Sequence, residues 1–126
     1  MKKALLLLLA FCLCSFETGT ISKKGIVLIH YNAGFNSANN YVDVVKITNA
    51  KVYRASIDNN LELRQNEGIH TVPTLILYKN GKEIKRWEAG INLSLRHIDY
   101  HEIQKEINEL RSKEYFKAIR DIDKVI

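Results

Sequence analysis

A single proline, Pro73, constrains the fold of this 126-residue chain more than any other residue. It precedes an apolar stretch at 75–78, an Asn-Gly pair at 80–81 and a second stretch at 82–87. Because proline has no N–H to donate to a sheet ladder, it belongs at the start or the edge of a strand. A lone proline at such a turn is also the natural candidate for a cis peptide bond. The segment therefore predicts a strand led by Pro73, a two-residue turn and a second antiparallel strand.

Strands and helices are predicted to alternate along the rest of the chain. Apolar, β-branched runs at 25–31 and 51–57 are typical of buried strands. The apolar residues of 41–47 suit one face of a short helix, and 61–67 suits another helix with Asn60 as its N-cap. With the proline hairpin, the order β-α-β-α-β-β-α predicts an α/β domain whose mixed β-sheet is flanked by helices.

The chain is predicted to end in an extended helix. Asp99 and Glu102 fit the capping box that marks a helix start. We expect its apolar stripe to pack on the sheet as far as Leu110, so that 111–126 forms a helical extension beyond the domain. The apolar residues that recur at mostly helical spacing are Ile103, Ile107, Leu110, Phe116, Ile119 and Ile122.

The first 19 residues are typical of an export signal. Two lysines at 2–3 precede eleven apolar residues at 4–14, which is the right length for a signal peptide and too short to span a membrane. The sequence therefore predicts a protein exported to the periplasm or secreted. Cleavage after the second cysteine would remove both Cys12 and Cys14. A lipid anchor on either cysteine, or an uncleaved anchor, remains the alternative.

Charge and histidine placement argue against two classes of ligand. The net charge of +5 falls to +3 when the two lysines at 2–3 are removed, because 17 cations then face 14 anions. No basic run is interleaved with aromatic residues, so we expect no nucleic-acid partner. His70, His97 and His101 do not have the spacing of a metal set. The sequence predicts no metal and no cofactor, and membrane contact only through the N-terminal signal or a lipid anchor.

The segment G-I-x-x-V-P-T at 68–74, followed by the Asn-Gly-Lys hairpin turn, resembles the cis-proline region of the thioredoxin family. The resemblance covers roughly residues 24–110 and implies a thioredoxin-like fold for that range. It also extends to the rhythm aromatic-x-Ala-x-aromatic at 31–35. Further matching positions are Ile57, Asp58 and Gly90.

The same resemblance implies that the family's redox chemistry is absent. Phe35 falls where the family has tryptophan, and Asn36 and Asn39 fall on the two positions of the Cys-x-x-Cys motif. Dithiol exchange needs a reactive thiolate and a second sulfur, and asparagine supplies neither. His30 and Arg54 fall on the positions of the family's buried acid and nearby lysine. We therefore expect no catalytic residues and no oxidoreductase activity.

A peptide-binding groove is the function that the resemblance leaves in place. In thioredoxin-like folds the residue before the cis-proline offers its backbone to an extended peptide, a form of strand addition. Here that residue is Val72. The two asparagine amides either cap a helix and contact solvent or hydrogen-bond a partner. The predicted binding residues are Phe35, Asn36, Asn39, Thr71, Val72, Pro73 and Gly90.

Two alternatives remain open at this stage. The chain could be a thioredoxin-fold enzyme of another class, although the residues that such an enzyme needs are not found. It could instead be an interaction protein that uses the C-terminal helix for self-association or for contact with a membrane surface. That helix face could also fold back on its own domain. Its apolar residues are Tyr115, Phe116, Ile119, Ile122 and Ile126.

Overall fold

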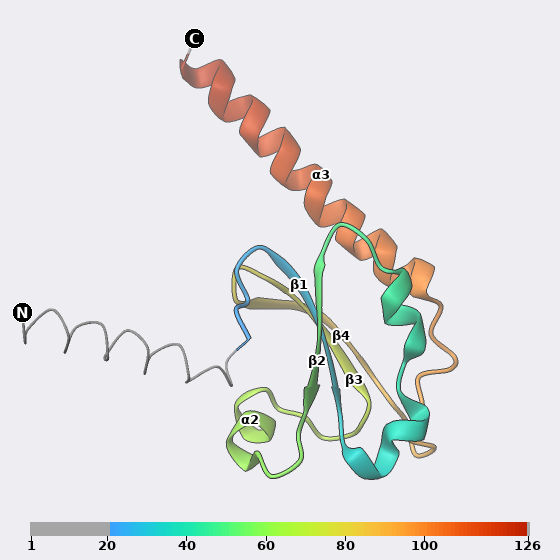
Figure 1. Cartoon of the computed structure of the whole chain (residues 1–126). Coiled ribbons are helices and arrows are strands. Elements are labelled where there is room, and N and C mark those ends of the chain that lie inside the picture. Colours follow the sequence, from blue (N-terminus) through green and yellow to red (C-terminus); the bar gives the residue numbers. More distant parts are fainter. Residues whose placement is uncertain (1–20, 126) are drawn as a thin grey trace, which may run out of the picture.

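A four-stranded mixed sheet forms the centre of the structure, a computed structural model that describes residues 21–125 (Figure 1). In the strand order β2-β1-β3-β4, β1 pairs in parallel with β2 and antiparallel with β3, and β3 and β4 form an antiparallel hairpin. The predicted α/β architecture is confirmed. The predicted signal peptide and both cysteines lie outside the described residues. The strands are β1 (Ile26–Asn32), β2 (Lys51–Ser56), β3 (Thr74–Lys79) and β4 (Lys82–Glu88).

The inner strands are buried because both faces of the sheet are covered. All seven residues of β1 are buried. Side chains alternate between two cores along the strands, so that Leu28 and Leu75 face one core and Ile29 and Ile76 face the other. Figure 1 shows the 3₁₀ helices and the start of α3 on one face, and α2 near the other.

The proline hairpin has the predicted form. Asn80 and Gly81 both have positive φ, +50° and +84°, as a type I′ turn requires. The Val72–Pro73 peptide bond is cis, and the Pro73 carbonyl accepts a hydrogen bond from the Ala89 N–H (3.2 Å). Pro73 thus stands just before the first residue of β3, where its missing N–H costs the ladder nothing.

The helix predicted over 41–47 is wrong in type. Two 3₁₀ helices occupy this part of the chain, η1 (Gly34–Asn39) and η2 (Val42–Lys46). Val42 and Val45, assigned to the apolar helix face, are 65% and 76% exposed. The buried side chains instead recur every three residues, which is the repeat of a 3₁₀ helix. They are Tyr41, Val44 and Ile47.

The short helix α2 (Leu61–Asn66) begins as predicted and ends one residue before the predicted Glu67. The Asn60 side chain accepts a hydrogen bond from the Leu63 N–H (2.9 Å), which confirms it as the N-cap. Gly68, just past the end of the helix, has a positive φ of +62°. Glycine adopts this conformation at low cost, so the chain can turn toward Pro73.

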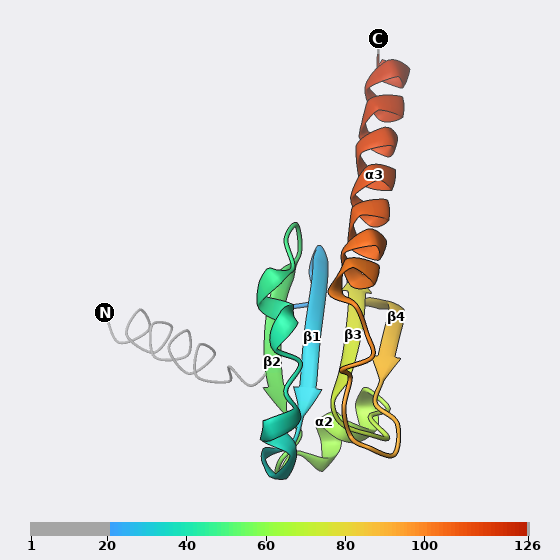
Figure 2. The same cartoon turned by 90° about the vertical axis from the view of Figure 1, so that its right-hand side faces the viewer.

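The C-terminal helix α3 (Tyr100–Val125) is 26 residues long and projects beyond the sheet (Figures 1 and 2). Asp99 caps it by accepting from the His101 N–H (3.0 Å), but the Glu102 carboxylate lies near Lys85 and does not complete the capping box. As predicted, the stripe packs on the sheet only as far as Leu110. No helix within residues 21–125 is both long and apolar enough to span a bilayer. The buried residues of α3 are Ile103, Ile107 and Leu110.

Candidate functional site

A cluster of asparagine amides closes the loop that follows β1. The Asn32 Oδ1 accepts from the Ala33 N–H (2.9 Å) and from the Asn36 amide (3.1 Å). Its Nδ2 donates to the Asn36 carbonyl (3.0 Å) and to the Asn40 Oδ1 (2.7 Å). Asn32 thereby uses both ends of its amide to fix the backbone of η1.

Asn36 joins three separate segments of the chain. It is buried, and its Nδ2 lies within hydrogen-bond distance of the Val72 carbonyl (3.2 Å) and the Leu93 carbonyl (3.1 Å). Its Oδ1 accepts from the half-buried Asn39 amide (2.8 Å). The two asparagines at the expected cysteine positions are therefore bonded to each other. Their amides hold the proline loop and the turn at 90–93 against η1.

A shallow pocket of about 230 Å³ opens beside this cluster. It brings together three of the predicted binding residues, because Phe35, Thr71 and Val72 all contribute to its wall. Phe35 is 79% exposed, so its ring presents apolar surface to solvent. The other lining residues are Ile57, Arg64, Ile69, His70 and Leu93.

The remaining predicted residues lie around the pocket but do not line it. Pro73 and Asn36 are buried, and the half-buried Asn39 donates to the Asn36 Oδ1. Gly90 is exposed in the adjoining turn, where its carbonyl accepts from the Leu93 N–H (3.0 Å). Within residues 21–125, the Val72 N–H has no hydrogen-bond acceptor, although its carbonyl is bonded to Asn36. Val72 thus keeps a backbone donor beside the pocket.

His30 is a structural residue. It is buried, and its Nε2 accepts from the Tyr41 N–H (3.0 Å), which requires an unprotonated nitrogen. Burial, with the nearby Arg54 charge, lowers the pKa of His30 to about 4. It is neutral at pH 7, and its accepting nitrogen is already occupied. No group of histidine, cysteine and acidic residues with metal-binding geometry occurs in the described part of the chain.

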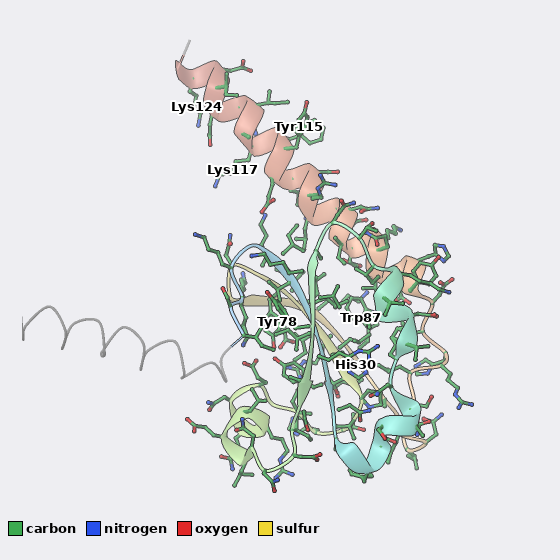
Figure 3. All side chains as sticks on the ribbon, in the orientation of Figure 1. His30, Tyr78, Trp87, Tyr115, Lys117 and Lys124 are labelled. Carbon is green, nitrogen blue, oxygen red and sulfur yellow. The ribbon has the colours of Figure 1, made fainter. Side chains whose placement is uncertain are left out.

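The face of the sheet opposite to His30 holds a pair of buried tyrosines. The hydroxyls of Tyr31 and Tyr78 lie 2.9 Å apart, and the Tyr78 hydroxyl donates to Glu67 (2.8 Å), which also pairs with Lys23. Burial raises the pKa of Tyr31 to about 12 and that of Tyr78 further. Figure 3 shows Tyr78 across the sheet from His30 and Trp87. Both hydroxyls stay protonated at neutral pH and stabilise the packing of the loop after α2.

Two residues of the site were not predicted from the sequence. Asn32 is the centre of the amide cluster, and four asparagines between 32 and 40 were the available signal. Leu93 adopts a positive φ of +55°, which is uncommon for a non-glycine residue, and its carbonyl faces Asn36. Nothing in the local sequence marks Leu93 as part of the site.

Comparison with solved structures shows that the fold is thioredoxin-like. A thioredoxin mutant from Halobacterium salinarum is 22% identical, with a TM-score of 0.54 over 70% of this chain and 76% of that one. Thioredoxin 1 from Thermosipho africanus is 16% identical, with a TM-score of 0.54 over 71% and 98%. Schistosoma mansoni thioredoxin is 15% identical, with a TM-score of 0.51 over 69% and 78%.

The likeness is one of structure only. No protein-family model and no curated protein sequence matches the chain. At identities of 22% and below, the neighbours define the fold class and not the activity. The chain is thus a protein of thioredoxin-like fold, whose asparagine-bearing loop lies where the resemblance puts the Cys-x-x-Cys motif.

Proposed function

We propose that the protein is an exported, redox-inactive thioredoxin-like module that binds extended segments of other proteins beside Pro73. The amide cluster carries the proposal. The Asn36 and Asn39 side chains occupy the predicted cysteine positions and bond each other, the proline loop and the neighbouring turn. This arrangement holds the walls of a pocket in place without any need for sulfur.

Redox inactivity is supported by the chemistry of the residues present. Amide side chains neither form a mixed disulfide nor carry two electrons. His30, in the position of the family's buried acid, is neutral at pH 7 and already accepts the Tyr41 N–H. Export is proposed from the signal-like sequence of residues 1–19.

Peptide binding is supported by what borders the pocket. The exposed ring of Phe35 and the buried Ile69 offer apolar contact to a side chain of a ligand. The unbonded N–H of Val72 offers a donor to the carbonyl of an extended peptide. Together they provide the two parts of strand-addition recognition, a backbone hydrogen bond and a side-chain pocket.

An insulin-disulfide reduction assay tests the first half of the proposal. The protein, purified after export, is expected to show the rate of a blank without protein, with an authentic thioredoxin as the positive control. Turnover above the blank contradicts redox inactivity. A rate equal to that of the blank supports redox inactivity and does not bear on peptide binding, which is tested separately.

Binding is tested by NMR titration of the labelled protein with alkylated insulin B chain, an extended apolar peptide without a free thiol. Shift changes are expected at the residues lining the pocket. Phe35→Ala is expected to weaken binding by about tenfold, the cost of losing one well-placed aromatic contact. Val45→Ala, which removes a comparably exposed side chain on η2, is the matched control. Equal weakening by both variants, or shifts away from the pocket, contradicts the proposal.

A further inference from the structure

A separate pocket of about 310 Å³ lies beside the edge strand β2 and shares no lining residue with the pocket near Pro73. Its walls come from β1, β2 and the loop that contains η1. The volume has room for about ten waters at about 30 Å³ each, so a small ion fits with part of its hydration shell. The polar side chains in its walls are those of His30, Asn32, Ser37, Asn40, Arg54 and Ser56.

Arg54 supplies the one formal charge in the pocket wall. It lies in register with His30 on the neighbouring strand, so the two side chains point to the same face of the sheet. After burial, the Arg54 charge is the next cause that lowers the pKa of His30, so the two groups interact across the pocket. Within residues 21–125, no carboxylate lies within ion-pair distance of Arg54. Asp58, which follows β2, instead accepts from the Gly34 N–H (2.8 Å).

His30 leaves a buried donor in the same wall. Its side chain is 2% exposed, and Figure 3 shows it between the sheet and the 3₁₀ helices, where its Nε2 accepts from the Tyr41 N–H. The neutral ring therefore carries its proton on Nδ1. Besides the carbonyl of His30 itself, the described residues offer this N–H no acceptor. Every fully buried side-chain nitrogen or oxygen in that range has a partner, so the Nδ1 atom is open to the pocket.

The other polar side chains of the wall also leave donors open rather than acceptors. The Asn32 amide is satisfied at both ends. The Asn40 Oδ1 accepts from Asn32 (2.7 Å), but its Nδ2 has no acceptor within residues 21–125. The Ser56 Oγ accepts from the Asp58 N–H (3.1 Å), so its own proton is free to donate, and Ser37 adds another hydroxyl. The pocket thus presents donors from three segments and one positive charge.

We propose that this pocket binds a small tetrahedral oxyanion, inorganic phosphate or sulfate, held by the Arg54 guanidinium and the His30 Nδ1–H. Such an ion offers only acceptors and brings the missing negative charge, and hydrogen bonds to charged groups are the stronger ones. Its four oxygens can meet donors from β1, β2 and the η1 loop together, whereas a carboxylate has two. Because Arg54 is exposed, solvent screens its charge, and we expect a dissociation constant of about 1 mM.

NMR titration of the isotope-labelled protein with sodium phosphate at pH 7 tests the site, with sodium chloride added to keep the ionic strength constant. Saturable shift changes are expected at the His30 ring nitrogens and at the backbone amides of 34–40 and 54–56. Arg54→Gln is expected to raise the dissociation constant by about tenfold or more, the loss of one charge-assisted hydrogen bond. Arg96→Gln removes another exposed charge, outside the pocket wall, and is the matched control. It is expected to bind phosphate like the wild type.

A parallel titration with sodium acetate tests the class of ligand, and the planar ion is expected to bind more weakly than phosphate. Loss of saturable phosphate binding in Arg54→Gln alone, with an unchanged fold in the NMR spectrum, supports the site. Shifts that rise linearly without saturation, or equal weakening in the two variants, overturn it. Acetate binding as tight as that of phosphate overturns the tetrahedral oxyanion as the ligand. Saturable binding without any response of the His30 ring overturns His30 as a donor.

Discussion

Asn36 shows how one buried amide can organise a loop. Its Nδ2 faces carbonyls that come from positions 36 and 57 residues further along the chain. Asn36→Ala is expected to lower the free energy of unfolding by about 2 kcal/mol, because it leaves the buried Val72 carbonyl and the half-buried Leu93 carbonyl without a donor. Urea denaturation measures the loss. Ser37→Ala, at the exposed next position, is expected to change it by less than about 0.5 kcal/mol.

His30 makes stability depend on pH. The unfolded chain takes up a proton on His30 near the ordinary pKa of 6.5, whereas the native protein does so only near 4. Between these values the unfolded state binds more protons, so the free energy of unfolding falls as the pH falls from 7 to 4. The shift corresponds to about 3 kcal/mol.

The His30 contribution is isolated by comparison with His30→Gln, whose side-chain oxygen can still accept from Tyr41. Denaturant titrations of both proteins from pH 7.5 to pH 4 give two stability profiles. We expect the difference between them to grow as the pH falls, and to level off below about pH 4. Parallel profiles would mean that His30 titrates normally in the native state.

The β3–β4 hairpin depends on glycine at one position only. Gly81 has a φ of +84°, and a Cβ added there would contact nothing within 4 Å, so the cost of alanine is purely conformational. Gly81→Ala is expected to cost about 1 kcal/mol in thermal or chemical denaturation. Gly90 lacks a positive φ and its added Cβ would approach the Asn92 side chain no closer than 3.8 Å. Gly90→Ala is therefore a matched control that should be nearly neutral, and an equal loss in both variants would contradict the turn assignment.

The element prediction that failed is the α-helix over 41–47, where the chain forms the 3₁₀ helix η2. Tyr41, Val44 and Ile47 are spaced for a 3₁₀ helix, but their run also contains Val42 and Val45, which filled out an apparent α-helical face. Apolar residues in a short window cannot distinguish repeats of 3.0 and 3.6. The contacts of these side chains with α3 and the sheet decided which of them are buried.

In the molecule as a whole, stability is concentrated in the sheet and declines along α3. The inner strands β1 and β3 are almost fully buried, while α3 is unprotected after Leu110. In dilute solution, hydrogen exchange is expected to be slowest in β1 and β3 and fastest, among the regular elements, in the outer turns of α3. Protection of those outer turns that rises with protein concentration would instead indicate self-association of the helix. Uniform protection along α3 at low concentration would contradict this gradient.

The local residue pattern was enough to predict the strands, the Asn-Gly turn, the Asn60 cap and the order of the elements along the chain, while the thioredoxin-like fold was implied by the resemblance of residues 68–74 to that family. These features depend on the conformational preferences of residues that are neighbours in the chain. Such preferences do not depend on how the rest of the molecule folds. The hydrogen bonds of the Asn36 amide and the bond from the Tyr41 N–H to His30 could not be predicted in this way. Each depends on which distant segments the folded chain brings into contact, as when Asn36 meets Leu93 across 57 positions. Only packing of the whole chain fixes such contacts, because a side chain's own sequence neighbourhood carries no record of its distant partners.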